Sequence, residues 1–272
     1  VYRGSLISLK QLPDGAHTLH YYAVDHVGNS GNANDNAEAF HFYLDSEPPT
    51  PSISIVGDQY LTDEKFFVSL RSEVKLEAED NKSGVKSIKY GVNQDRILGY
   101  TQPFNIRLGT GYFTVTYFAE DKFGNVGEKQ KKRFFMDEKA PSSEYRIEGT
   151  FYRQRSTIWV PKASKLFFSA EDSESGLQKI EYQISKKGIQ EYDYKPIQRA
   201  EEDNYLVRFW GVDNVNNREE DNVILLIVDN TPPDIKAIFS VDKIDDMTVE
   251  GKQVEVYPQY TTLFLAAIDK AS

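Results

Sequence analysis

The side chains that most often carry enzyme chemistry are scarce in this sequence or stand without the partners they need. The chain contains no Cys, which excludes thiolate nucleophiles, disulfides and cysteine-bound zinc. Two of its four His, His17 and His20, are three apart in an expected strand. They point to opposite faces and cannot share a metal. No glycine-rich phosphate loop is present. The sequence therefore predicts no catalytic residue, no organic cofactor and a protein that is not an enzyme.

Carboxylates are the reactive groups that recur in a fixed pattern. The segment Tyr22-Ala-Val-Asp-His-Val-Gly-Asn29 returns at 118–125 and at 210–217. The segment Ala78-Glu-Asp-Asn-Lys-Ser-Gly84 returns at 170–176 and begins again at 267. An acid also opens each proline-containing stretch, at Asp45, Asp137 and Asp229. Successive copies lie 92 to 97 residues apart. The elements that position these acids must therefore repeat as well.

The repeat length and its phase predict the domain organisation. A period of about 92 residues fits one immunoglobulin-like sandwich of about 100 residues. We take the proline stretches as linkers, which places a C-terminal half repeat at 1–47 and complete repeats at 48–139 and 140–231. An N-terminal half repeat then occupies 232–272. We expect the chain to be part of a longer polypeptide.

Within each repeat the apolar residues alternate with polar ones, which indicates strands. Before the recurring acids, one face carries Tyr117 and Ala119 in one copy and Phe209 and Gly211 in the next. No helical period appears. The sequence predicts an all-β fold of tandem immunoglobulin-like sandwiches in an elongated array. The linker prolines fix φ and remove a backbone donor, so the joints should have little freedom.

The recurring acids are expected to converge where neighbouring repeats join, because the B–C and F–G loops share one end of such a sandwich. Clustered oxygen ligands suit Ca²⁺. In the alternative interpretation each Asp only closes its own turn by accepting backbone N–H groups. The candidate structural calcium ligands are Asp45, Glu47, Glu79, Asp80 and Asp121 at one junction, and Asp137, Glu138, Glu171, Asp172 and Asp213 at the next.

Three aromatic residues stand at one repeated position, three residues before Asp25, Asp121 and Asp213. They are Tyr22, Phe118 and Trp210. The strand alternation turns them away from the core, so they form a candidate ligand-binding row that would stack on sugar rings or on a partner strand. The alternative is that a long Lys or Arg side chain or a neighbouring strand covers each ring.

The ordered set of motifs resembles a known family. The set comprises the Asp-x-x-Pro-Pro linker at 45–49, Ala78-Glu-Asp-x-x-Ser-Gly84, Tyr100-Thr-Gln-Pro-Phe104 and Phe118-Ala-Glu-Asp-x-x-Gly-Asn125. It is similar to the bacterial Ig-like repeats named after a leptospiral outer-membrane surface protein, and to Ig-like tail modules of some secreted bacterial glycosidases. The resemblance covers essentially the whole chain. It implies an array at the bacterial cell surface or outside the cell, or one associated with the outer membrane.

Charge and hydropathy limit the partners. The formal net charge of −10 argues against nucleic acid, which needs a basic surface. No apolar stretch approaches the length of a membrane helix. We expect a non-catalytic structural or adhesive stalk segment of a larger envelope or secreted protein, with a protein or a surface glycan as partner. The alternatives are accessory modules, carbohydrate-binding or spacer, of a secreted polysaccharide-degrading enzyme, and a subunit of an outer-membrane-associated complex.

Overall fold

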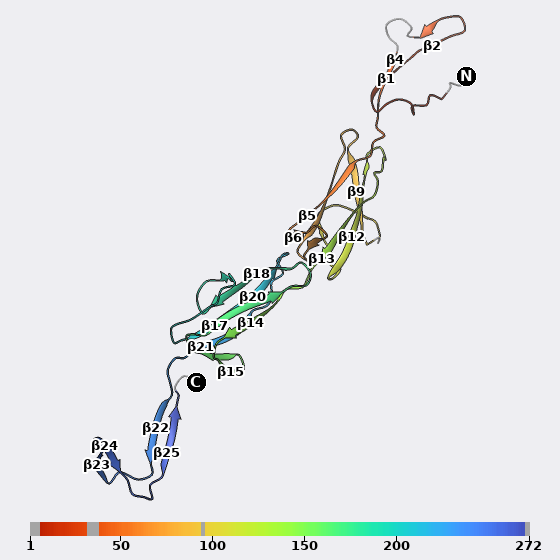
Figure 1. The fold of residues 1–272 in the computed structure, drawn as a ribbon. Coiled ribbons are helices and arrows are strands. Elements are labelled where there is room, and N and C mark those ends of the chain that lie inside the picture. Colours follow the sequence, from red (N-terminus) through yellow and green to blue (C-terminus); the bar gives the residue numbers. More distant parts are fainter. Residues whose placement is uncertain (1–5, 32–37, 94–95, 270–272) are drawn as a thin grey trace. The chain divides into compact units, whose positions relative to one another are not determined.

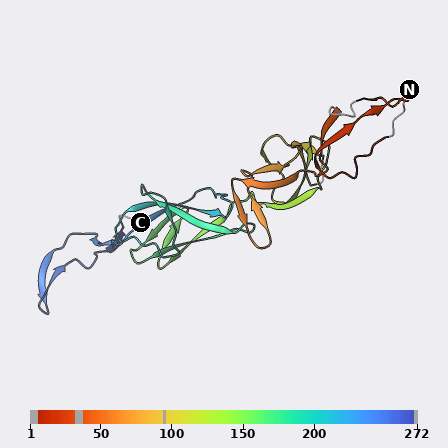
Figure 2. The ribbon, with the colours of Figure 1, turned by 90° about the horizontal axis from the view of Figure 1, so that it is seen from above.

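The computed structural model describes residues 6–31, 38–93 and 96–269, and all regular structure in these ranges is β-strand (Figures 1 and 2). The chain divides into two units. Unit 1 comprises Val1–Lys139 with Asn214–Asn216, and unit 2 comprises Ala140–Asp213 with Asn217–Ser272. Within the described ranges, no helix is present that could cross a membrane.

Unit 1 contains one complete sandwich made of two sheets. One sheet has the order β11-β8-β5 and the other the order β10-β9-β12-β13-β7-β6. The strands are β5 (Thr50–Val56), β6 (Gln59–Leu61), β7 (Phe66–Val68), β8 (Glu73–Glu79), β9 (Val85–Val92), β10 (Leu98–Gly99), β11 (Phe104–Asn105), β12 (Gly111–Asp121) and β13 (Gln130–Met136). Strand β7 pairs in parallel with β13, whereas the other pairs are antiparallel.

Unit 2 repeats this arrangement. One sheet pairs β14 with β17, and the other has the order β15-β16-β21-β20-β18-β19. The strands are β14 (Ser142–Glu148), β15 (Tyr152–Gln154), β16 (Thr157–Val160), β17 (Lys165–Glu171), β18 (Leu177–Ile184), β19 (Gln190–Glu191), β20 (Asn204–Asp213) and β21 (Asn222–Val228). An isolated bridge from Leu166 to Ile197 replaces the short strand β11 of unit 1.

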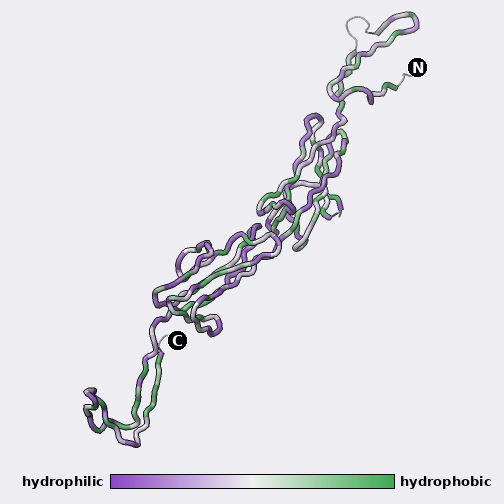
Figure 3. Tube along the Cα trace, in the orientation of Figure 1, coloured by the Kyte–Doolittle hydropathy of each residue, from purple (hydrophilic) through white to green (hydrophobic). Residues whose placement is uncertain are grey.

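Each unit also carries hairpins outside its sandwich. In unit 1, β1 (Gly15–Tyr21) pairs with β4 (Glu38–Leu44), and β2 (Ala23–Val24) pairs with β3 (Ser30–Gly31). In unit 2, β22 (Asp234–Phe239) pairs with β25 (Leu263–Ile268), and β23 (Asp245–Val249) pairs with β24 (Lys252–Val256). Figure 3 shows apolar residues along β22 and β25. Whether these hairpins are the half repeats expected at 1–47 and 232–272 stays a prediction.

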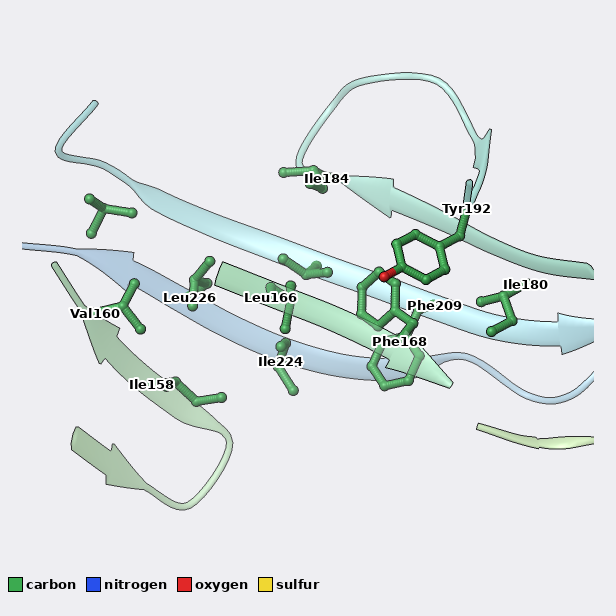
Figure 4. Packing of buried hydrophobic residues seen from close by; sticks show 12 residues of the cluster. Ile158, Val160, Leu166, Phe168, Ile180, Ile184, Tyr192, Phe209, Ile224 and Leu226 are labelled. Atoms are coloured by element: carbon green, nitrogen blue, oxygen red, sulfur yellow. The ribbon is translucent and has the colours of Figure 1, made fainter. Parts of the chain in front are cut away.

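The alternating residues form the cores, as the sequence pattern predicts. In β12, Phe113, Val115, Tyr117 and Ala119 are buried, and in β20 Val207 and Phe209 are buried. Figure 4 shows the core of unit 2, where Phe168 and Phe209 stack with ring centroids 4.5 Å apart. The expected all-β class of tandem immunoglobulin-like sandwiches is therefore confirmed.

Candidate functional site

Three aspartates of unit 1 come together at one end of its sandwich. Asp45 follows β4, Asp80 follows β8, and Asp121 is the last residue of β12. One carboxylate oxygen of each lies within 4.8 Å of the others. The strands position them because β8 and β12 finish at the same end of the sandwich, where the linker with Asp45 enters.

Asp121 is fully buried, and both of its carboxylate oxygens accept hydrogen bonds. Oδ1 accepts from the backbone N–H groups of Phe123 and Asn125, at 2.9 and 2.7 Å. Oδ2 accepts from Ser83 Oγ and Asn125 Nδ2, at 2.9 and 2.7 Å. Burial alone would raise the pKa of Asp121, but these hydrogen bonds outweigh it and hold the pKa below its ordinary value.

Asp45 connects the linker to both loops of the sandwich. Its Oδ2 accepts from Ser83 N at 3.0 Å, its backbone oxygen accepts from Asn125 Nδ2 at 3.0 Å, and its Oδ1 accepts from Glu47 N at 3.1 Å. Asp80 Oδ1 accepts from the N–H groups of Lys82 and Gly84. We call Asp45, Asp80, Ser83, Asp121 and Asn125 the linker clasp, because these contacts hold the incoming chain against two loops.

The carboxylates of the linker clasp act as hydrogen-bond acceptors that close turns. A carboxylate oxygen has about two acceptor positions, so the four donors to Asp121 fill its capacity. A calcium ion needs about 6–8 oxygen ligands at about 2.3–2.6 Å and would compete with these donors. The contacts therefore support the turn-closing interpretation for Asp80 and Asp121. They add a role that the sequence pattern did not indicate, namely attachment of the linker.

The glutamates expected in the calcium set lie outside this group. Glu79 is exposed at the end of β8. Glu47 is exposed and pairs with Lys82, whose Nζ lies 2.9 Å from Glu47 Oε2 and 2.7 Å from Asp14 Oδ2. The Lys82 hydrogen bond is the main cause that lowers the pKa of Asp14 to about 2. In the second set, Glu138 and Glu171 are also exposed.

The sequence positions of the three aspartates recur as Asp137, Asp172 and Asp213. Asp137 belongs to unit 1, where it is buried directly after β13, and its Oδ1 accepts from Lys139 N at 3.1 Å. In unit 2, Asp172 Oδ1 accepts from Gly176 N at 2.7 Å. Asp213 accepts from Asn217 N at 2.7 Å and from Asn217 Nδ2 at 2.8 Å. Unit 2 thus repeats the turn contacts of Asp80 and Asp121.

Sequence reasoning missed Ser83 and Asn125 as functional residues, although a signal for both was present. Each belongs to a recurring motif, with Ser175 and Asn217 at the equivalent positions. Their roles depend on which loop faces which, and that is a property of the folded sandwich. The ion pair between Lys82 and Asp14 had no signal, because the two residues are 68 positions apart and no motif contains both.

The expected row of outward aromatic residues is not present. Tyr22 is 66% exposed, but Phe118 and Trp210 are only 8% and 2% exposed. Lys129 Nζ lies 5.6 Å from the centre of the Phe118 ring, and the Arg218 guanidinium lies 4.1 Å from that of Trp210. Trp210 Nε1 also donates to Glu181 Oε2 at 2.9 Å. The rings do lie on the outer side of the sheet, but neighbouring side chains cover them, so the alternative of covered rings applies to both.

A linker proline is packed directly on the sandwich of unit 2. Pro141 is buried, and a Cβ added to Gly211 would lie 2.8 Å from Pro141 Cβ. Strand β20 therefore has Gly where the equivalent position of β12 has Ala119. In unit 1, Pro48 and Pro49 lie against Gly127, where an added Cβ would be 3.1 Å from Pro49 O.

We expect Gly211→Ala to destabilise unit 2 by about 1–3 kcal/mol, because the added methyl group overpacks the contact with Pro141. The measurement is urea unfolding followed by tryptophan fluorescence. Gly188→Ala is the matched control, since nothing lies within 4 Å of its added Cβ. A Gly211→Ala protein as stable as the control would show that Pro141 does not pack here.

Among solved structures, the chain is similar to the fibronectin(III)-like modules of Clostridium thermocellum CbhA, with 11% sequence identity and a TM-score of 0.37. The match covers 65% of this chain and 94% of that one. No family model matches the sequence, and no curated protein does.

Proposed function

We propose that this chain is a non-catalytic structural and adhesive segment of a larger bacterial cell-envelope or secreted protein, in which sandwich domains follow one another through restricted joints. The observation that carries the proposal is the linker clasp. Its acids, which recur at every repeat, accept hydrogen bonds that fix the linker to the sandwich. Residues that recur and whose oxygens are filled by contacts to turns and to the linker favour a mechanical role over catalysis.

The linker prolines support the same proposal, because they pack against the sandwich that follows each linker. Pro141 is held against Gly211 within unit 2, and Pro49 is buried against Gly127 within unit 1. A proline that is packed on the domain and also has a fixed φ contributes little rotational freedom to the joint. An array with such joints keeps the module at its end at a defined distance from the surface, which is what a stalk requires.

The other functions have less support. The carbohydrate-binding accessory module depended on an exposed aromatic row, and two of its three rings are covered. A subunit role in an outer-membrane-associated complex stays a prediction without a contact that favours it. A structural calcium ion is not part of the proposal, because hydrogen-bond donors already occupy the carboxylate oxygens of Asp121.

A spin-label distance measurement tests the restricted joint. The chain has no Cys of its own, so the substitutions Glu77→Cys in β8 and Ser169→Cys in β17 create the only two sites to which a spin label can attach. Both positions are exposed, one in each unit. We expect a single narrow distance distribution by double electron–electron resonance. Replacement of Ala140 and Pro141 by Gly should broaden it, since the fixed φ and the packed ring are both lost.

The matched control adds Gly188→Ala, a change outside the linker, to the labelled protein and should leave the distribution unchanged. A broad distribution in the native linker, with no further broadening after the glycine replacements, would contradict a restricted joint and with it the stalk function.

A further inference from the structure

An open groove of about 850 Å³ runs along one side of the sandwich of unit 2. Its first wall is Ser143–Ile147 of β14, and its second wall is Asn222–Ile224 of β21. The turn between β15 and β16 closes one end with Arg155 and Ser156. This volume is within the range of about 300–1,000 Å³ that is usual for ligand sites.

The first wall is a strand edge without a partner strand. In the described sheets β14 pairs only with β17. Ser143 N donates to Glu219 Oε1 at 2.9 Å, so the backbone of Ser143 is turned away from β17. Because backbone direction alternates along a strand, Tyr145 and Ile147 also turn their N–H and C=O groups toward the groove. The described chain supplies no backbone partner for them on that side.

The second wall has the same property. Strand β21 pairs with β20 along Asn222–Ile227 but with β16 only from Leu225 onward. Leu225 N donates to Ser156 O at 2.9 Å, which places the backbone groups of Leu225 on the β16 side. Val223, two residues earlier, turns its backbone to the same side, before the pairing with β16 begins. Both walls therefore offer main-chain donors and acceptors to the groove.

A buried hydroxyl group beside the groove lacks a partner. The hydroxyl of Tyr145 is buried and has no hydrogen-bond partner in the described chain. The Ser143 hydroxyl, in contrast, lies beside the Glu219 carboxylate, which also accepts from Ser143 N. An unsatisfied buried hydroxyl is unfavourable and is rare in folded proteins. The floor of the groove is apolar and includes the buried residues Ile158, Phe209 and Ile224, all labelled in Figure 4.

The charge around the groove is positive, although the chain as a whole is acidic. Three arginines line it against one acid, Glu144. Arg146 lies 3.7 Å from Glu148. Arg153 donates through Nε to the backbone oxygen of Arg155 at 3.0 Å, and its guanidinium lies 5.7 Å from the centre of the Tyr145 ring. In the part of the chain that the structure describes, neither Arg153 nor Arg155 forms an ion pair.

We propose that this groove binds an extended segment of a partner polypeptide that carries acidic side chains and pairs as an added strand with the free edge of β14. Main-chain hydrogen bonds to Tyr145 and Ile147 provide affinity, and alternate side chains of the segment enter the apolar floor. Its carboxylates face Arg153 and Arg155, and one of its polar groups pairs with the hydroxyl of Tyr145. The proposal goes beyond the stalk function and does not depend on the stiffness of the joint.

The test uses an array of synthetic nonapeptides and the full chain. Every peptide alternates β-branched apolar residues with Thr and carries Asp or Glu at both ends. A matched array carries Lys at the ends, and a third places Pro at the centre, where it removes a main-chain donor. Fluorescence anisotropy should detect binding of acidic peptides at least about tenfold tighter than of their Lys or Pro counterparts. Amide exchange at Tyr145 and Ile147 should slow when an acidic peptide binds.

Charge reversal at the groove separates this site from general surface attraction. The Arg153→Glu and Arg155→Glu protein should lose acidic-peptide binding by at least about tenfold. Lys162→Glu, a change outside the groove in unit 2, should not. A melting curve of each variant checks that it is folded. The comparison of acidic, Lys and Pro peptides uses the native protein, so it tests the proposal even if a variant does not fold.

Three results would overturn the proposal. One is that every acidic peptide has a Kd above about 1 mM, because binding that weak is not specific recognition. Another is equal binding of the acidic and Lys arrays. The third is binding of oligogalacturonate by the arginines without binding of any peptide, which would assign the groove to an acidic glycan instead.

Discussion

Asp121→Ala is expected to lower the melting temperature of unit 1 by several degrees and to leave the transition of unit 2 in place. The substitution removes the acceptor of four hydrogen bonds, which are donated by the N–H groups of Phe123 and Asn125, by Ser83 Oγ and by Asn125 Nδ2. Loss of a buried carboxylate that accepts several hydrogen bonds is among the more destabilising single changes. Differential scanning calorimetry measures both transitions. Asp63→Ala, at an exposed position of unit 1, is the control and should change little.

The same substitution should alter the response to acid. The pKa of Asp121 is lowered in the folded protein, so its ionised form contributes stability above the ordinary Asp pKa of about 4. That contribution is lost as the pH falls through the lowered pKa. Asp121→Ala should therefore flatten the decline of unit 1 stability below about pH 5. An unchanged melting temperature together with an unchanged acid profile would show that Asp121 is not the centre of the linker clasp.

Phe209→Ala is expected to destabilise unit 2 by about 3–5 kcal/mol, as is usual for removal of a buried aromatic ring. Phe209 is 2% exposed, stacks on Phe168 and meets Tyr145 edge-on at 6.1 Å. The substitution leaves a cavity between the two sheets. Urea unfolding should show an earlier transition for unit 2 and an unshifted one for unit 1.

Leu206→Ala provides the matched control on the same strand. Leu206 lies on the other face of β20 and is 39% exposed, so its truncation removes little buried area. Equal destabilisation by the two substitutions would contradict the assignment of the apolar face of β20 to the core.

The fold could be predicted from the sequence because its signals are local. Alternation along β12 and β20 depends only on the period of a strand, and the cores contain the residues that this alternation selects. The recurrence of Asp80 and Asp121 likewise indicates repeated strand ends. Both signals are readable without knowing which strands are neighbours.

The unpredicted features depend on contacts between distant segments. Cover of Trp210 by a long Lys or Arg side chain was one of two interpretations, and the sequence alone could not choose between them. The bridge between Val212 and Arg218, which places Arg218 beside Trp210, decides it. Gly211 is required by Pro141, which is 70 residues earlier. The sequence indicated that the motifs of Asp45, Asp80 and Asp121 converge, but it did not indicate that Ser83 and Asn125 are the donors that attach Asp45.

Backbone ¹⁵N relaxation at Ser46 and Glu47, in buffer with a chelator, tests most directly whether hydrogen bonds alone hold the linker. Ser46 N donates to Asp14 and Glu47 N donates to Asp45. The linker clasp predicts order parameters near the value of about 0.85 for rigid backbone, unchanged by added Ca²⁺ and lowered by Asn125→Ala. Values below about 0.6 that rise only when Ca²⁺ is added would contradict it and would assign the aspartates to a metal site.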